Sequence, residues 1–132
     1  MQIPCPRQKI IINMSYTEDL LFKADEIIPR VTLEDFNNDL NAKVMIDVRQ
    51  QEELQASGTV RGSIHIPKGV LEFRLNSNDK ISFDTSVYVF CAIGVRSAIA
   101  GYNLKKVGYQ KVFNLVGFQD ILDQGAEKQF LI

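Results

Sequence analysis

The sequence predicts an α/β domain with a mainly parallel central sheet and helices on both faces of that sheet. Short apolar segments of strand character alternate with helical segments along the chain, a pattern typical of parallel sheets with helical crossovers. The strongest strand candidate, residues 86–90 (Ser-Val-Tyr-Val-Phe), is β-branched and aromatic and carries no charge. The length of 132 residues is enough for one domain with its own core.

The N-terminal residues 1–15 are predicted to form a loosely attached arm, because Pro4 and Pro6 interrupt regular structure there. Residues 16–132 are then the single folded domain. Cys5 lies between the two prolines, so we expect it to be an exposed thiol without a specialised role.

Two helices are predicted at the start of the domain. Residues 17–28 carry apolar side chains at helical spacing, with Thr17 as the N-cap and Pro29 as the stop. Residues 33–40 form the second helix, which Thr32 can cap.

The remaining elements alternate in type. The sequence predicts further strands and helices in this order: strands at 43–48, 63–66, 86–90 and 112–116, and between or after them helices at 50–56, 68–75, 96–107 and 118–123.

Composition excludes several classes of function. Fifteen Lys and Arg against sixteen Asp and Glu give a net charge of −1, so we expect neither a nucleic-acid nor an anionic-membrane partner. The N-terminus lacks the apolar core of a signal peptide, and no apolar run approaches the length of a membrane span. Two cysteines form no disulfide framework, which favours a reducing, cytoplasmic setting. One histidine and two cysteines are too few for an ordinary zinc site, so no metal is expected.

The segment from residue 86 to residue 107 carries the chemistry. A buried strand delivers Cys91 to the edge of the sheet where ligands of parallel sheets bind. A short loop containing Gly94 follows, and a helix begins near Arg96. Backbone amides of such a loop, together with the helix N-terminus, can hold an anion and favour the thiolate of Cys91.

This loop, Cys91-Ala-Ile-Gly-Val-Arg-Ser97, resembles the Cys-x-x-Gly-x-Arg active loop of the rhodanese-like sulfurtransferases. Segments 45–49 (Met-Ile-Asp-Val-Arg), 62–67 (Gly-Ser-Ile-His-Ile-Pro) and 112–118 (Val-Phe-Asn-Leu-Val-Gly-Phe) resemble further motifs of that family in the same order. The chain departs from the family pattern at residues 58–62 and at Phe118, both outside the loop.

The resemblance implies a sulfurtransferase that needs no cofactor. Cys91 would take a sulfane sulfur from a small donor such as thiosulfate and pass it to a thiol or cyanide acceptor, or to an accepting protein. Amides of the loop would stabilise the persulfide, and Arg96 would orient the donor or pin the loop. Ser97 would cap the helix or donate a hydrogen bond into the loop. The site residues expected are Cys91 as nucleophile, with Ala92, Ile93, Gly94, Val95, Arg96 and Ser97 binding substrate.

Two alternatives remain open. A persulfide carrier that does not turn over would have the same chemistry at Cys91. A cysteine-dependent phosphatase or arsenate reductase is disfavoured, because those loops have five residues between Cys and Arg and this loop has four.

Other polar residues are interpreted as structural. We expect Asp47 and Arg49 to pair with each other or with a nearby loop, and His65 to be a hydrogen-bonded structural histidine. Lys68 and Arg74 are expected at the solvated surface.

Overall fold

A computed structural model describes residues 8–131 of the chain, with side chains from residue 16 onward. The elements follow in this order: α1 (Gln8–Ile27), α2 (Leu33–Asn38), β1 (Lys43–Asp47), α3 (Gln51–Ser57), β2 (Thr59–Val60), β3 (Ile64–His65), the 3₁₀ turn η1 (Lys68–Val70), α4 (Leu71–Asn76), β4 (Ser86–Cys91), α5 (Val95–Val107), β5 (Lys111–Gly117), α6 (Phe118–Asp123) and β6 (Lys128–Gln129).

The central sheet is parallel throughout, in the order β3-β1-β4-β5. Strand β4 lies inside this sheet between β1 and β5, and all six of its residues are buried. Its apolar composition therefore follows from cover on both faces. Because the strands run the same way, the carboxyl ends of β1 and β4 lie at one edge of the sheet, and Cys91 is the last residue of β4.

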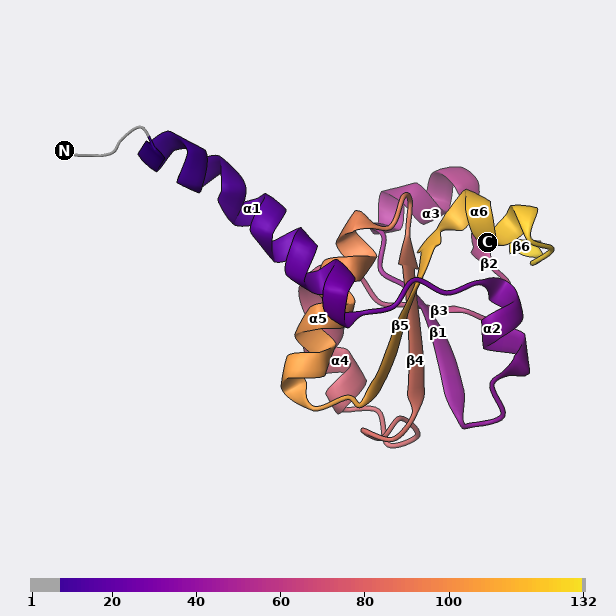
Figure 1. Ribbon diagram of the computed structural model, residues 1–132. Coiled ribbons are helices and arrows are strands. Elements are labelled where there is room, and N and C mark those ends of the chain that lie inside the picture. The colour runs from indigo at the N-terminus through magenta and orange to yellow at the C-terminus, as the bar shows by residue number, and fades with distance from the viewer. Residues whose placement is uncertain (1–7, 132) are drawn as a thin grey trace.

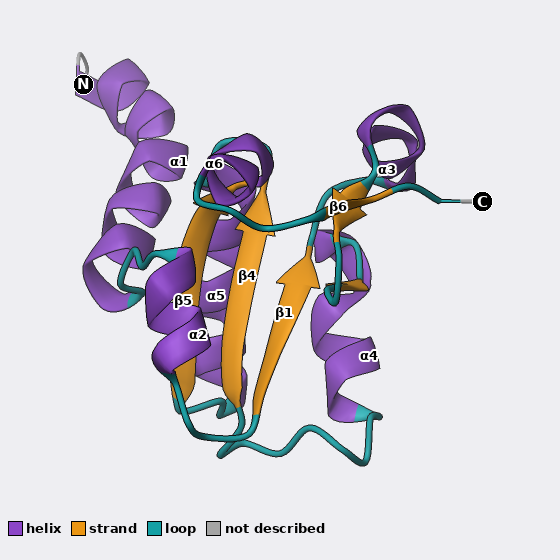
Figure 2. Ribbon diagram, turned by 90° about the vertical axis from the view of Figure 1, so that its right-hand side faces the viewer, coloured by secondary structure: helices purple, strands orange, loops and turns teal. Residues whose placement is uncertain are grey.

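Two apolar layers flank the sheet, as the sequence predicts. Alternate residues of β4 point to opposite layers, since Val87 and Val89 pack with α5 and α4, whereas Tyr88 and Phe90 pack with α2 and α6. Figures 1 and 2 show α4 and α5 on one face of the sheet and α2 and α6 on the other.

Helix α1 departs from the prediction at its start. It begins at Gln8 and not at Thr17, so residues 8–15 of the predicted arm are helical and continuous with α1. No glycine or proline interrupts these residues, and extending an existing helix costs less than starting one. The C-terminal half of α1 packs on α5, while the N-terminal half projects away from the domain (Figure 1). Cys5 and the two prolines beside it lie outside the described residues.

The other predicted elements are present with no end shifted by more than three residues, and the helix predicted at residues 68–75 is divided into η1 and α4. Thr32 caps α2 as expected, in a capping box with Asp35. Strands β2 and β6 were not predicted; they pair as a small antiparallel sheet with two residues in each strand. Within residues 8–131, no helix is long and apolar enough to cross a bilayer.

Candidate active site

Cys91 lies at the junction of β4, a three-residue loop and the N-terminus of α5. Its sulfur accepts hydrogen bonds from the backbone N–H of Gly94 at 3.0 Å and of Ser97 at 3.4 Å. The hydroxyl of Ser97 lies 3.4 Å from the same sulfur. These donors converge because the chain turns sharply after the strand and points its next free amides back at the strand end.

The pKa of Cys91 is set by two opposing effects. The residue is fully buried, and burial raises the pKa of the thiol. Hydrogen bonds from the Ser97 hydroxyl and from the amides of Ser97, Gly94 and Ile93 favour the thiolate, and together they bring the pKa below its ordinary value. This direction agrees with the expectation that the loop favours the thiolate, although the sulfur itself is buried.

Gly94 makes the close turn possible. It precedes the first residue of α5 and has a φ of +99°, in the left-handed region that favours glycine. A Cβ at this position would lie 2.7 Å from Cγ1 of Val116. The requirement for glycine is thus both conformational and steric.

Asn114 is the site residue that the sequence interpretation missed. It is fully buried in β5, and its Nδ2 donates to the carbonyl of Gly94 at 3.1 Å. Its Oδ1 accepts from the Ser97 hydroxyl at 2.7 Å and from the N–H of Val116 at 2.9 Å. A bulge in β5 next to Asn114 gives Val116 a φ of +76°. The available signal was a polar side chain in an otherwise apolar strand, which must find partners when buried.

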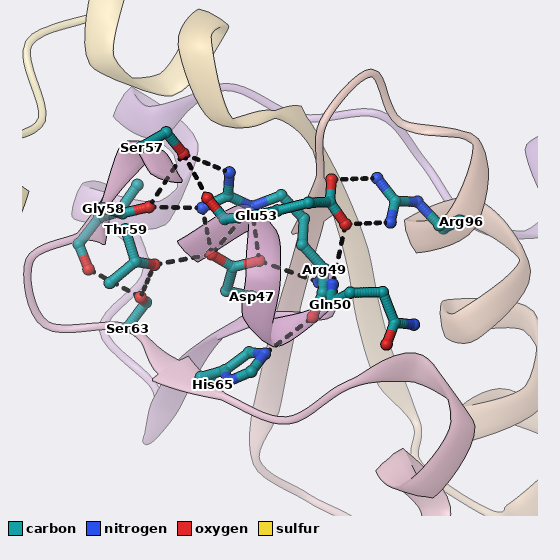
Figure 3. Close-up of polar contacts among 11 residues, drawn as sticks. Asp47, Arg49, Gln50, Glu53, Ser57, Gly58, Thr59, Ser63, His65 and Arg96 are labelled. Atoms are coloured by element: carbon teal, nitrogen blue, oxygen red, sulfur yellow. Dashed lines mark hydrogen bonds and ion pairs between the residues drawn. The ribbon is translucent and has the colours of Figure 1, made fainter. Parts of the chain in front are cut away.

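The guanidinium of Arg96 forms an ion pair with the carboxylate of Glu53 in α3, as the right-hand side of Figure 3 shows. Its two terminal nitrogens donate to the two carboxylate oxygens at 2.6 and 2.8 Å. These hydrogen bonds lower the pKa of Glu53 to about 2, so the carboxylate is charged at neutral pH. Glu53 also accepts from the N–H of Gln50 in the capping box of α3. Of the two roles expected for Arg96, the structure provides the contact that pins the loop.

The expected pairing of Asp47 and Arg49 is confirmed. Both side chains are buried at the end of β1, and Arg49 donates to both carboxylate oxygens of Asp47. Arg49 also donates to Ser57 and to the carbonyl of Gly58, while Thr59 donates to Asp47 (Figure 3). These hydrogen bonds connect the residues before α3 to the residues at its C-terminal end. Glu53 of α3 lies on the side of the helix that faces Arg96.

The remaining candidates lie apart from the sulfur. His65 is half-buried and its Nε2 lies 2.7 Å from the carbonyl oxygen of Arg49, which agrees with a structural role. Arg74 lines an open depression together with His65 and Lys80, and none of the loop residues 91–97 lines it. Lys68 belongs to η1, next to α5.

Comparisons with known proteins identify the family. A sequence model of the Rhodanese-like domain matches residues 32–120, and the chain belongs to that family. The putative sulfur carrier protein YrkF of Bacillus subtilis strain 168 is 37% identical over 100 residues, which cover 70% of this chain and 50% of YrkF. The chain thus matches only about half the length of that relative.

Two solved structures show the same fold. The human single-domain sulfurtransferase TSTD1 has a TM-score of 0.62 and 27% identity, covering 73% of this chain and 96% of its own. A Rhodopseudomonas palustris CGA009 protein, described as a possible tyrosine phosphatase, has a TM-score of 0.70 and 24% identity, covering 86% and 93%. The second likeness concerns the fold alone.

Proposed function

We propose that the protein is a sulfurtransferase that carries a sulfane sulfur on Cys91. The observation that carries the proposal is the convergence of the Gly94 and Ser97 amides on the sulfur, at the end of a buried strand. A thiolate held in this way is a nucleophile without a neighbouring base. His65, the one histidine of the chain, contacts the carbonyl of Arg49 and is not required as a base.

The reaction has two steps. The Cys91 thiolate attacks the outer sulfur of a donor such as thiosulfate; the new S–S bond forms as the old one breaks, and sulfite leaves with the bonding electron pair. A thiolate or cyanide then attacks the outer sulfur of the persulfide and releases the Cys91 thiolate. Loop amides that hold Sγ stabilise the Cys91 thiolate as it leaves in the second step, which lowers the barrier of that step. Neither step requires a metal or an organic cofactor.

A persulfide carrier that delivers its sulfur to one protein acceptor is the second candidate. It is favoured by the likeness to YrkF, whose description is a putative sulfur carrier. The two functions share the loaded state of Cys91 and differ in whether a small acceptor empties it repeatedly.

Intact mass after incubation with a donor tests the proposal. We expect one added sulfur atom on the wild type and on Cys5→Ser, and none on Cys91→Ser. Repeated turnover with cyanide would assign an enzyme, whereas a single loading emptied only by a protein would assign a carrier. Loading of Cys91→Ser, or hydrolysis of an aryl phosphate that depends on Cys91, would refute the sulfurtransferase assignment.

A further inference from the structure

We infer that the ion pair of Glu53 and Arg96 is a gate over Cys91, and that a sulfur donor or acceptor reaches the sulfur only after this pair opens. The inference rests on the proposed function, because it concerns how reactants reach the same thiolate. Cys91 is fully buried. A bond to Sγ can form only when the reacting atom comes within about 3.5 Å of it. A second conformation, in which the sulfur is exposed, is therefore required.

Most of the enclosure around Cys91 is fixed by the fold. Strand β4 lies between β1 and β5, and Cys91 belongs to the apolar cluster that packs with α4 and α5. The turn after Cys91 is held from β5, because Nδ2 of Asn114 donates to the carbonyl of Gly94 at 3.1 Å. The carbonyl oxygen of Ala92 also packs on β5, only 2.6 Å from where a Cβ at Gly117 would lie. The backbone of the turn therefore cannot move aside without breaking its contacts with β5.

The side chain of Arg96 is the movable part of the enclosure. Its two terminal nitrogens donate to the carboxylate of Glu53 at 2.6 and 2.8 Å. Those hydrogen bonds are the largest cause of the raised pKa of Arg96, and the Cys91 thiolate raises this pKa further, so the guanidinium lies close to the sulfur. The side chains of Arg96 and Glu53 are 35% and 32% exposed. Rotation of the Arg96 side chain would uncover the sulfur without any change in the backbone of the turn.

Glu53 holds the gate closed from a different element. It belongs to α3, and its carboxylate also accepts from the N–H of Gln50 at the start of that helix. The position of Glu53 is thus fixed, and its ion pair with the longer Arg96 side chain keeps the guanidinium beside the sulfur. Because both partners are partly exposed, dissolved ions weaken their attraction. The pair lowers the reactivity of Cys91, and both its removal and its screening by salt should raise that reactivity.

Alkylation by iodoacetamide measures access to the sulfur directly, because this reagent is uncharged and nearby charges do not steer its approach. Rates are measured in a Cys5→Ser background, at a pH above the midpoint of Cys91 in every variant, so that the thiolate fraction is constant. Each rate is divided by that of a free low-molecular-weight thiolate under the same conditions. We expect Glu53→Gln to react about fivefold faster than the background chain. Glu52→Gln makes the same change in net charge at the exposed neighbouring position and should react at the background rate.

Two further measurements use the background chain with Glu53 intact. An increase in salt from about 0.02 to about 0.5 M should raise the alkylation rate about threefold, and this rise should disappear in Glu53→Gln. Urea at concentrations well below the unfolding transition should change the rate little, because rotation of one side chain exposes little surface. A rate that increases steeply with urea would mean that global unfolding exposes Cys91, and the inference would be overturned.

Loading by thiosulfate, followed by mass in the same variants, separates this inference from the proposed function. We expect faster loading in Glu53→Gln than in Glu52→Gln. Equal alkylation rates in these two variants, or no effect of salt on the background chain, would overturn the gate and leave the sulfurtransferase intact. Absence of loading in every variant, although Glu53→Gln is alkylated faster, would reject the proposed function while the gate over the thiol stands.

Discussion

The hydroxyl of Ser97 lies 2.7 Å from Oδ1 of Asn114 and 3.4 Å from the sulfur of Cys91, so one proton has two acceptors. Oδ1 is fixed as an acceptor, because Nδ2 of the same amide donates to Gly94 and the N–H of Val116 also points at Oδ1. The hydroxyl can donate to the sulfur when the charge resides there, and to Asn114 once a persulfide has moved the charge outward. Ser97 and Asn114 therefore form a pair that adapts to both states of Cys91.

Replacement of Ser97 by alanine should raise the pKa of Cys91. The variant keeps the backbone N–H of residue 97 but loses the hydroxyl that favours the thiolate. Burial, which raises the pKa of Cys91, is then opposed by fewer hydrogen bonds. The rate of alkylation against pH, measured in a Cys5→Ser background, should show a midpoint at higher pH than without the substitution. Ser77→Ala, at an exposed position after α4, is the control. An unchanged midpoint would contradict a role of the hydroxyl in holding the thiolate.

Replacement of Asn114 by alanine should impair both the fold and the loading of sulfur. The N–H of Val116 would lose its partner, at about 1–3 kcal/mol for a group left unpaired. The carbonyl of Gly94 would keep only the N–H of Ala98, and the hydroxyl of Ser97 would keep only the sulfur of Cys91. Thermal unfolding should show a lower Tm, and single-turnover loading at a temperature where the variant is folded should be slower. Asn38→Ala, an exposed position of α2, should change neither. A lower Tm with unchanged loading would confine Asn114 to a role in stability.

Local features of the sequence were sufficient to predict the position of Cys91 in the fold. A buried strand, a glycine three residues after the cysteine and a helix start are all encoded within residues 86–97. The partner of Arg96 could not be predicted in this way, because Glu53 is 43 residues away and meets it only after α3 packs beside the loop. Asn114 was missed for the same reason, since a bulge in β5 determines where its amide points.

Secondary structure outside the site shows the same limit. The parallel sheet was predictable because its strands are mostly apolar segments of five residues or more, apart from the two-residue β3. Strands β2 and β6 have two residues each, too few for an alternating pattern, and their partners Thr59 and Gln129 are far apart in the sequence. The start of α1 at Gln8 could be predicted only from the absence of a residue that stops a helix. That absence is a weaker sequence signal than the presence of a capping residue.

Replacement of Glu53 by glutamine should increase loading from thiosulfate. The amide keeps an oxygen for the N–H of Gln50, but it removes a negative charge and leaves the guanidinium of Arg96 less completely paired. An increase of about fivefold in the rate with thiosulfate is expected at low ionic strength, because thiosulfate carries two negative charges. Glu52→Gln makes the same change in net charge at the exposed neighbouring position. Equal effects of the two variants would exclude a specific role for the pair with Arg96.

The pair of Glu53 and Arg96 should also give stability a defined dependence on pH. The pKa of Glu53 is about 2 in the folded chain and 4.5 for the unperturbed group, so the carboxylate binds protons more weakly when folded. Its contribution to stability is therefore complete above pH 4.5 and is lost as the pH falls towards 2. Urea unfolding of the wild type and Glu53→Gln should show a difference that is constant from pH 5 to 8 and shrinks below 4.5. A difference that persists unchanged at pH 3 would contradict this assignment.

Replacement of Gly94 by alanine should abolish loading while leaving the domain folded. Two costs are combined at this position: a φ of +99°, and a Cβ at 2.7 Å from Val116, which the bulge of β5 holds in place. Gly62→Ala separates them, because Gly62 has a φ of +88° but nothing within 4 Å of its Cβ. That control should lose only the conformational part, about 1–2 kcal/mol, and keep full loading.

The difference between the two variants measures the steric part of the requirement. Relief of the contact with Val116 must move the turn, and the amide of Gly94 that donates to Cys91 moves with it. The pKa of Cys91 should then rise in Gly94→Ala and not in Gly62→Ala, as read from alkylation against pH. If both variants lose the same stability and both keep the midpoint of the wild type, then Gly94 is needed only for its backbone conformation. The close packing of β5 against the loop would then have no part in holding the thiolate.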